Sequence, residues 1–68
     1  MTPTDDYIVL ARREDGKWDW GRYSKNNEYL YGSDQGYENK EDAIHIATTR
    51  NEGIPVFEVR YGRKIQIV

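Results

Sequence analysis

Aromatic side chains are the residues of this sequence best suited to binding. The stretch from Gly16 to Tyr23 reads GKWDWGRY, and the stretch from Tyr29 to Gly32 reads YLYG. In each stretch two large rings are two residues apart, so in an extended strand both rings of a pair point to one side. Aromatic and arginine side chains are enriched at protein interfaces, and aromatic rings also stack on the bases of single-stranded nucleic acid. The candidate binding residues are therefore Trp18, Trp20, Arg22, Tyr29 and Tyr31.

Two arrangements are open for the tryptophan pair. In the first, which we favour, both rings pack beneath a helix whose small residues Ala43 and Ala47 leave room for them. In the second, the rings form an exposed aromatic face bordered by Arg12, Arg22 and Arg60. The strand register decides whether the tryptophan and tyrosine pairs share one side, and the sequence leaves that register open.

Basic residues near the C-terminus support a second binding hypothesis. Arg60, Arg63 and Lys64 cluster around a predicted turn at 62–64, and clustered cations are what phosphate binding requires. The whole chain, however, has 10 basic and 12 acidic residues and a net charge of −2 at pH 7. Nucleic-acid-binding domains typically carry a basic excess, so protein binding ranks above nucleic-acid binding.

Groups that perform catalysis are scarce in this chain. His45 is the single histidine and falls on the predicted solvent side of a helix, where no nucleophile is placed to use it as a base. There is no cysteine, so disulfides and thiolate metal sites are excluded. Glu38, Glu41 and Asp42 are better explained as charges that favour a helix start than as metal ligands. We predict no enzymatic activity, no metal and no cofactor.

Three strands are predicted in the first half of the chain. The apolar run at 7–11 is typical of a central strand that is buried on both faces. Alternating patterns at 17–23 and 28–33 predict two more strands. The turn signals between them, at 14–16 and 24–27, are short, so the three strands form an antiparallel meander.

A single helix is predicted after the meander. Asn39 is its N-cap, and Asp42 is placed to close a capping box. The helix ends near Asn51, with Gly53 as a left-handed stop. The arc expected to face the sheet consists of Ala43, Ile44, Ile46 and Ala47.

The predicted fold class is α+β, with the element order β-β-β-α-β. A strand is expected at 56–61, and 65–68 forms either a short fifth strand or an extended tail. A right-handed crossover that returns beside the first strand gives the sheet order 3-2-1-4. One helix covers only one face of that sheet, so the other face is bare unless a partner covers it. Residues 1–5 are expected to be disordered, and 6–68 to form one domain.

The length of the chain favours self-association. A domain of 68 residues buries only about 60% of the surface that its unfolded chain exposes. Without disulfides or a metal, a homodimer is the remaining way to add core. No apolar run approaches the roughly 20 residues that cross a bilayer, and the start MTPTDDY lacks the features of a secretion signal. We therefore expect no membrane contact and a cytoplasmic location.

Several short motifs resemble the YegP-like domain, a small prokaryotic family of unknown function built from three strands and a helix. The likeness spans residues 7–51 and rests on the run at 15–20 (DGKWDW), the turn Asn26-Asn27, Gly36-Tyr37, and a helix with Ala43 and Ile44. The usual Asn-Gly of the second turn is Asn-Asn here. The segment 56–68 resembles another uncharacterised family of small bacterial and phage domains. The resemblance implies paired units, as tandem repeats or homodimers, and no catalytic residues.

The predicted function is non-catalytic protein binding by a small, self-associating module, with an exposed aromatic sheet face or edge as the interface. One alternative is nucleic-acid binding by the same aromatic residues together with the basic cluster. A second alternative, suggested by the occurrence of such domains in phage genomes, is a phage-encoded accessory protein that inhibits a host protein.

Overall fold

The predicted α+β class is confirmed by a computed structural model, which describes residues 5–33 and 35–68. Residues 1–4 of the expected disordered start lie outside this described part. The elements follow in the order β-β-β-α-β-β: β1 (Tyr7–Arg12), β2 (Trp18–Tyr23), β3 (Tyr29–Gly32), α1 (Lys40–Arg50), β4 (Val56–Arg60) and β5 (Arg63–Gln66).

The strands form one five-stranded sheet in the order β3-β2-β1-β4-β5. β2 is antiparallel to β1 and to β3, and β4 lies parallel to β1 on its other side. The meander and the order 3-2-1-4 are therefore confirmed. β5 pairs antiparallel with β4, which makes it the short returning strand rather than a tail.

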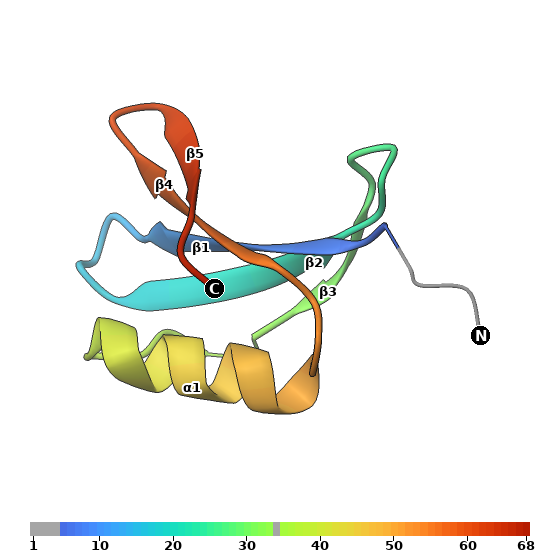
Figure 1. The fold of residues 1–68 in the computed structure, drawn as a ribbon. Coiled ribbons are helices and arrows are strands. Elements are labelled where there is room, and N and C mark those ends of the chain that lie inside the picture. Colours follow the sequence, from blue (N-terminus) through green and yellow to red (C-terminus); the bar gives the residue numbers. More distant parts are fainter. Residues whose placement is uncertain (1–4, 34) are drawn as a thin grey trace.

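Helix α1 lies along one side of the sheet, as Figure 1 shows. Its buried residues Ala43 and Ala47 have small side chains, which let the helix approach β1 and β2 closely. An α-helix is about 10 Å wide and strands are about 4.8 Å apart, so one helix shields roughly two strands. The buried hydrophobic core consists of Ile8, Leu10, Trp20, Ala43, Ala47 and Val56.

Strand β1 is central, as expected, but it is not buried on both faces. Ile8 and Leu10 point toward the helix and are fully buried. Tyr7, Val9 and Ala11 point to the other side and are only half-buried. The expectation was wrong because it assumed a second layer, and within 5–33 and 35–68 no element packs on that side. We call it the open face.

The ends of the helix match the sequence pattern in position but not in every contact. Asn39 is the N-cap residue, but its side chain makes no cap hydrogen bond. Its amide nitrogen instead lies 3.4 Å from Asp42 Oδ2, so the predicted capping box does not form. Asn51 follows the last turn, and Gly53 has the expected positive φ of 80°.

A bulge between β2 and β3 separates the two tyrosines of β3. Tyr31 pairs with Arg22 and Tyr29 pairs with Tyr23. β3 therefore has one extra residue, Leu30, opposite the step from Arg22 to Tyr23. Because Arg22 and Tyr23 point to opposite faces, their partners do as well. Tyr31 lies on the helix side and Tyr29 on the open face. The expectation that both tyrosines project together was wrong, because it assumed an unbroken ladder.

The turn between β4 and β5 consists of Tyr61 and Gly62, with φ of 50° and 75°. The predicted turn at 62–64 was therefore misplaced, and Arg63 and Lys64 belong to strand β5. Two positive φ values in a two-residue hairpin favour Asn-Gly or Asp-Gly, whereas a bulky side chain is strained there. Tyr61 is fully exposed and stabilises nothing by burial.

We expect Tyr61→Asn to stabilise the fold, because asparagine enters the left-handed region more readily than tyrosine. Urea unfolding should show a gain of about 0.5–1 kcal/mol in the free energy of unfolding with an unchanged m-value. Tyr61→Phe keeps the strain and serves as the control, so it should leave stability unchanged. A stabilisation by both variants would contradict the backbone explanation.

Candidate functional site

A row of aromatic rings crosses the open face from β3 to β4. Tyr29 contacts Tyr23 with 5.6 Å between ring centroids, and Tyr23 stacks on Tyr7 at 5.7 Å. Phe57 closes the row, with its ring 6.0 Å from that of Tyr7. Each ring comes from a different strand, and none of the four is fully buried. We call these four residues the aromatic row.

Two facing glycines leave space for Tyr29, at the outer end of the aromatic row. Gly21 and Gly32 are cross-strand partners in β2 and β3. A Cβ atom on Gly21 would lie 3.1 Å from the Tyr29 ring, and one on Gly32 would lie 2.8 Å from the Tyr29 hydroxyl. The absence of side chains at this pair lets the Tyr29 ring approach the backbone closely while it remains 62% exposed.

Neighbouring side chains contact part of the aromatic row. The planes of Tyr7 and Tyr23 are only 15° apart, so these rings cover each other. Lys64 Nζ lies 5.2 Å from the centroid of Tyr7, within cation–π range. The Tyr7 hydroxyl donates a hydrogen bond to Asn27 Oδ1. An open depression of about 490 Å³ lies here, lined by Asp5, Tyr7, Asn27, Pro55, Phe57 and Lys64.

The tryptophan pair lies on the helix side, in the arrangement that we favoured from the sequence. Trp20 is 2% exposed and belongs to the core, with the Arg50 guanidinium 5.5 Å from the centroid of its ring. Trp18 is half-buried against that core, and Lys40 Nζ lies 5.5 Å from its ring. Both rings therefore contribute to packing beneath α1.

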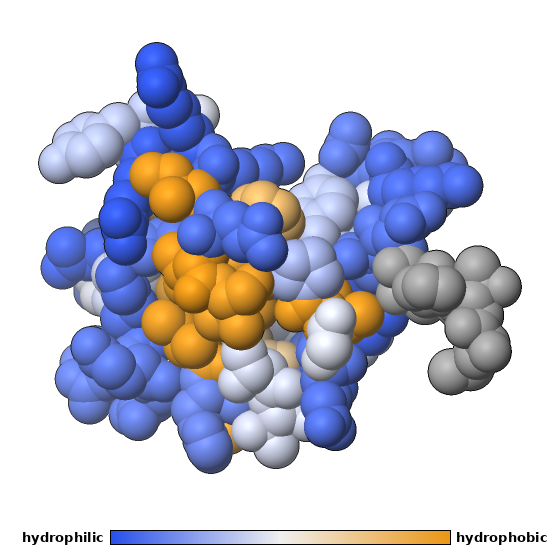
Figure 2. All heavy atoms as spheres, in the orientation of Figure 1, coloured by the Kyte–Doolittle hydropathy of each residue, from blue (hydrophilic) through white to orange (hydrophobic). Residues whose placement is uncertain are grey.

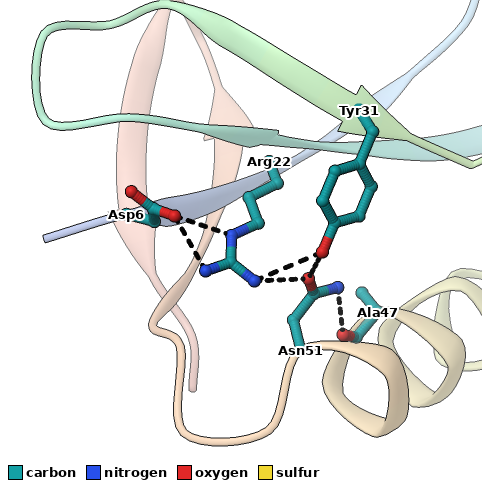
Figure 3. A network of polar contacts seen from close by, with 5 residues as sticks. All are labelled: Asp6, Arg22, Tyr31, Ala47 and Asn51. Carbon is teal, nitrogen blue, oxygen red and sulfur yellow. Dashed lines mark hydrogen bonds and ion pairs between the residues drawn. The ribbon is translucent and has the colours of Figure 1, made fainter. Parts of the chain in front are cut away.

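Arg22 also lies on the helix side, at the centre of a polar network (Figure 3). Its Nε and Nη2 atoms lie 2.9 and 2.7 Å from Asp6 Oδ2. Its Nη1 donates to Asn51 Oδ1 at 3.1 Å and to the Tyr31 hydroxyl at 3.2 Å. Asn51 Nδ2 donates to the Ala47 carbonyl at 2.9 Å. The network ties the C-terminal end of α1 to β2, to β3 and to the start of β1.

Of the five candidate residues, the structure places only Tyr29 on the open face. Tyr7, Tyr23 and Phe57, the other members of the aromatic row, were missed. The strand pattern could have identified two of them. Tyr23 points to the opposite side of its strand from the tryptophans, and Tyr7 points to the opposite side from Ile8. The exposed side of 7–11 was overlooked because an apolar strand suggests that both of its faces are buried.

The predicted arginine border does not surround the open face. The strand register places Arg12 beside Trp18 and Arg22 beside Tyr31, both on the helix side. Arg60 lies two residues from Glu58 in β4 and therefore on the same side of the sheet. Lys64 is the cation of the basic cluster that reaches the aromatic row.

Glu58 is a buried carboxylate held by two cations on the helix side. Its side chain is 5% exposed, and Arg60 binds it in a bidentate manner at 2.9 and 3.0 Å. Lys40, in the first turn of α1, lies 2.9 Å from Oε1. The hydrogen bonds from Arg60 are the main cause that lowers the pKa of Glu58 to about 2, with Lys40 adding to this effect and burial opposing it.

A second exposed apolar area lies beside the helix. Figure 2 shows it in the middle of the view, between α1 and the β4–β5 hairpin. Ile65 and Val68 are 39% and 55% exposed, and Ile67 is half-buried against the core. Because α1 is centred on β1 and β2, the helix side of β5 is left uncovered.

His45 is exposed on α1, as expected. Within 5–33 and 35–68, no three His, Asp or Glu side chains come together in a way that would hold a metal ion. No helix in this part of the chain is long and apolar enough to cross a bilayer.

We expect Arg22→Lys to destabilise the fold by about 1–3 kcal/mol, because an ammonium lacks the planar fork whose separate nitrogens reach Asp6 and the Asn51–Tyr31 pair, and Asn51 is buried. Urea unfolding measures the change. Arg63→Lys, in the exposed strand β5, is the matched control and should stay within about 0.5 kcal/mol. Equal stability of the two variants would show that the network does not anchor the helix.

The low pKa of Glu58 predicts acid sensitivity. A carboxylate with a lowered pKa contributes stability above its unfolded pKa of 4.5, and this contribution is lost as the pH falls toward 2. Wild type should exceed Glu58→Gln in unfolding free energy at pH 6, and the difference should shrink by about 1–3 kcal/mol by pH 2. Urea titrations across this range measure it, and a constant difference would contradict the assignment.

Comparisons of the chain with protein-family models, with curated proteins and with solved structures found no match, so the resemblance to the YegP-like family stays a prediction.

Proposed function

We propose that this protein is a non-catalytic protein-binding module that acts through the open face and its border at β3, and that its first partner is a second copy of the chain. The observation that carries the proposal is the aromatic row. Four rings from four strands line up on the side of the sheet that α1 does not cover. Interfaces are enriched in tyrosine and phenylalanine, and a partner would bury rings that solvent now contacts.

Self-association follows from the small size of the core. The buried hydrophobic residues come mainly from β1, β2, β4 and α1, on one side of the sheet. A chain of 68 residues without cysteine has neither a large core nor a disulfide to add stability. Burying part of the open face or its border against a second copy would supply the missing apolar contacts.

Nucleic-acid binding is less well supported by the geometry than protein binding. Stacking of bases requires free ring faces, whereas Tyr7 and Tyr23 cover each other. The basic cluster is also divided, because Arg60 is bound to Glu58 on the helix side while Lys64 lies across the open face. Phosphate binding gains its strength from several cations acting together.

Sedimentation equilibrium at several protein concentrations tests the proposal. We expect a reversible monomer–dimer equilibrium, and Tyr29→Glu should weaken it by at least about tenfold, because a carboxylate would be buried in the interface. Tyr61→Glu is the matched control, since Tyr61 is another exposed tyrosine, at the tip of the β4–β5 hairpin.

A monomer at every concentration would overturn self-association. Equal weakening of the dimer by Tyr29→Glu and Tyr61→Glu would overturn the placement of the interface at the open face and its border. Binding of an oligothymidylate that falls steeply with salt concentration, in a protein that stays monomeric, would favour the nucleic-acid alternative instead.

A further inference from the structure

We infer that two copies of this chain join side by side at β3, antiparallel to each other, so that their sheets become continuous. This inference rests on the proposed self-association and assigns its geometry. Two copies can meet on the proposed surface either face to face, with the aromatic rows opposed, or edge to edge along β3. The structure favours the second arrangement for four reasons.

The two edges of the sheet have opposite character. β5 reads RKIQ, and its Arg63 and Lys64 are exposed, so antiparallel pairing of two β5 strands would bring like charges together. Lysine and arginine on an edge strand are a common protection against such pairing. β3 reads YLYG and has neither a charge nor a proline. Leu30, at its centre, is 46% exposed.

The backbone of β3 has hydrogen-bonding groups available on its outer side. Ser33 N–H donates to the Trp20 carbonyl at 2.9 Å, so the backbone of Ser33 points toward β2. Because these groups alternate along a regular stretch of strand, the N–H and C=O groups of Gly32 point away from β2, and the bulge interrupts this alternation at Leu30. Among the described residues no strand pairs with this side of β3. A second β3 strand would satisfy these groups.

The bulge places one tyrosine on each side of this edge. Tyr29 lies on the open face, and Tyr31, 39% exposed, lies on the helix side. In an antiparallel pair the same two residues of the second copy would lie across the junction, so that rings cover it from both sides. The two aromatic rows would then meet at their Tyr29 ends and form one continuous row.

Face-to-face packing would instead bury a charged group, the ammonium of Lys64, which lies over Tyr7 on the open face. Burial of a hydroxyl or an ammonium without a hydrogen-bond partner is costly. Edge pairing leaves Lys64 in solvent, because β5 and β3 lie at opposite ends of the sheet.

Cross-linking of single cysteines tests the arrangement, because the chain has no cysteine of its own. Three variants of similar exposure, 39–46%, probe the three surfaces: Leu30→Cys at the β3 edge, Val59→Cys on the open face and Ile65→Cys on the helix side of β5. With a short bismaleimide, Leu30→Cys should form covalent dimers roughly a hundredfold faster than the other two, since paired thiols have a millimolar effective concentration.

A charge at the edge provides a second measurement. Leu30→Lys should weaken dimerisation in sedimentation equilibrium by at least about tenfold, because two ammonium groups would approach each other across the junction. Ile65→Lys, at the protected edge, should leave the dimer unchanged. Circular dichroism on both variants confirms that they are folded before the comparison is made.

The outcomes separate this inference from the proposed function. A wild-type dimer in which Val59→Cys or Ile65→Cys cross-links faster than Leu30→Cys would overturn the β3 junction and leave self-association standing. Polydisperse aggregates in place of a dimer would also overturn the junction. A monomeric wild type would overturn both proposals. Selective cross-linking at Leu30 together with loss of the dimer in Leu30→Lys would establish the junction.

Discussion

Coverage of five strands by one helix is the constraint on which the rest of this structure depends. α1 has 11 residues and lies over β1 and β2, and a helix is wide enough to shield only about two strands. Ile8, Leu10 and Trp20, on the helix side of these central strands, are buried, whereas β3 and β5 are largely exposed. The opposite side of the sheet has no second layer within the described residues. Each candidate surface of this protein is a part of the sheet that the helix does not reach.

Polar contacts at both ends of the helix compensate for the small core. Lys40, in the first turn, binds the buried carboxylate of Glu58 in β4. Asn51, just past the last turn, is held by Arg22 in β2. The helix therefore bridges two strands that lie on either side of β1. Arg22 was expected to border a binding face, but in the structure it positions the helix, which shows how readily a partly buried arginine is mistaken for an interface residue.

Much of the fold could be predicted from local patterns. The alternation in 17–23, the turn signal at 14–16 and the Asn39 and Gly53 signals located most of the strands and the helix. The central position of 7–11 followed from its apolar residues. The candidate site was predicted less well, and Tyr29 alone of the five candidates lies on the open face. Tyr7, Tyr23 and Phe57 come from three strands, and their proximity depends on cross-strand register, which is a long-range property.

The sequence by itself determined the approximate positions of the first four strands and of the helix, and that one helix has to leave one sheet face uncovered. These conclusions rest on periodicity and turn chemistry, which act over a few neighbouring residues. Only the tertiary structure decided which rings lie beneath the helix and which lie opposite it. A bulge between Arg22 and Tyr23 sends Tyr29 and Tyr31 to different sides of the sheet. A one-residue shift in pairing reverses the face of every residue beyond it, and that shift arises from contacts between strands rather than from the residues of either strand alone.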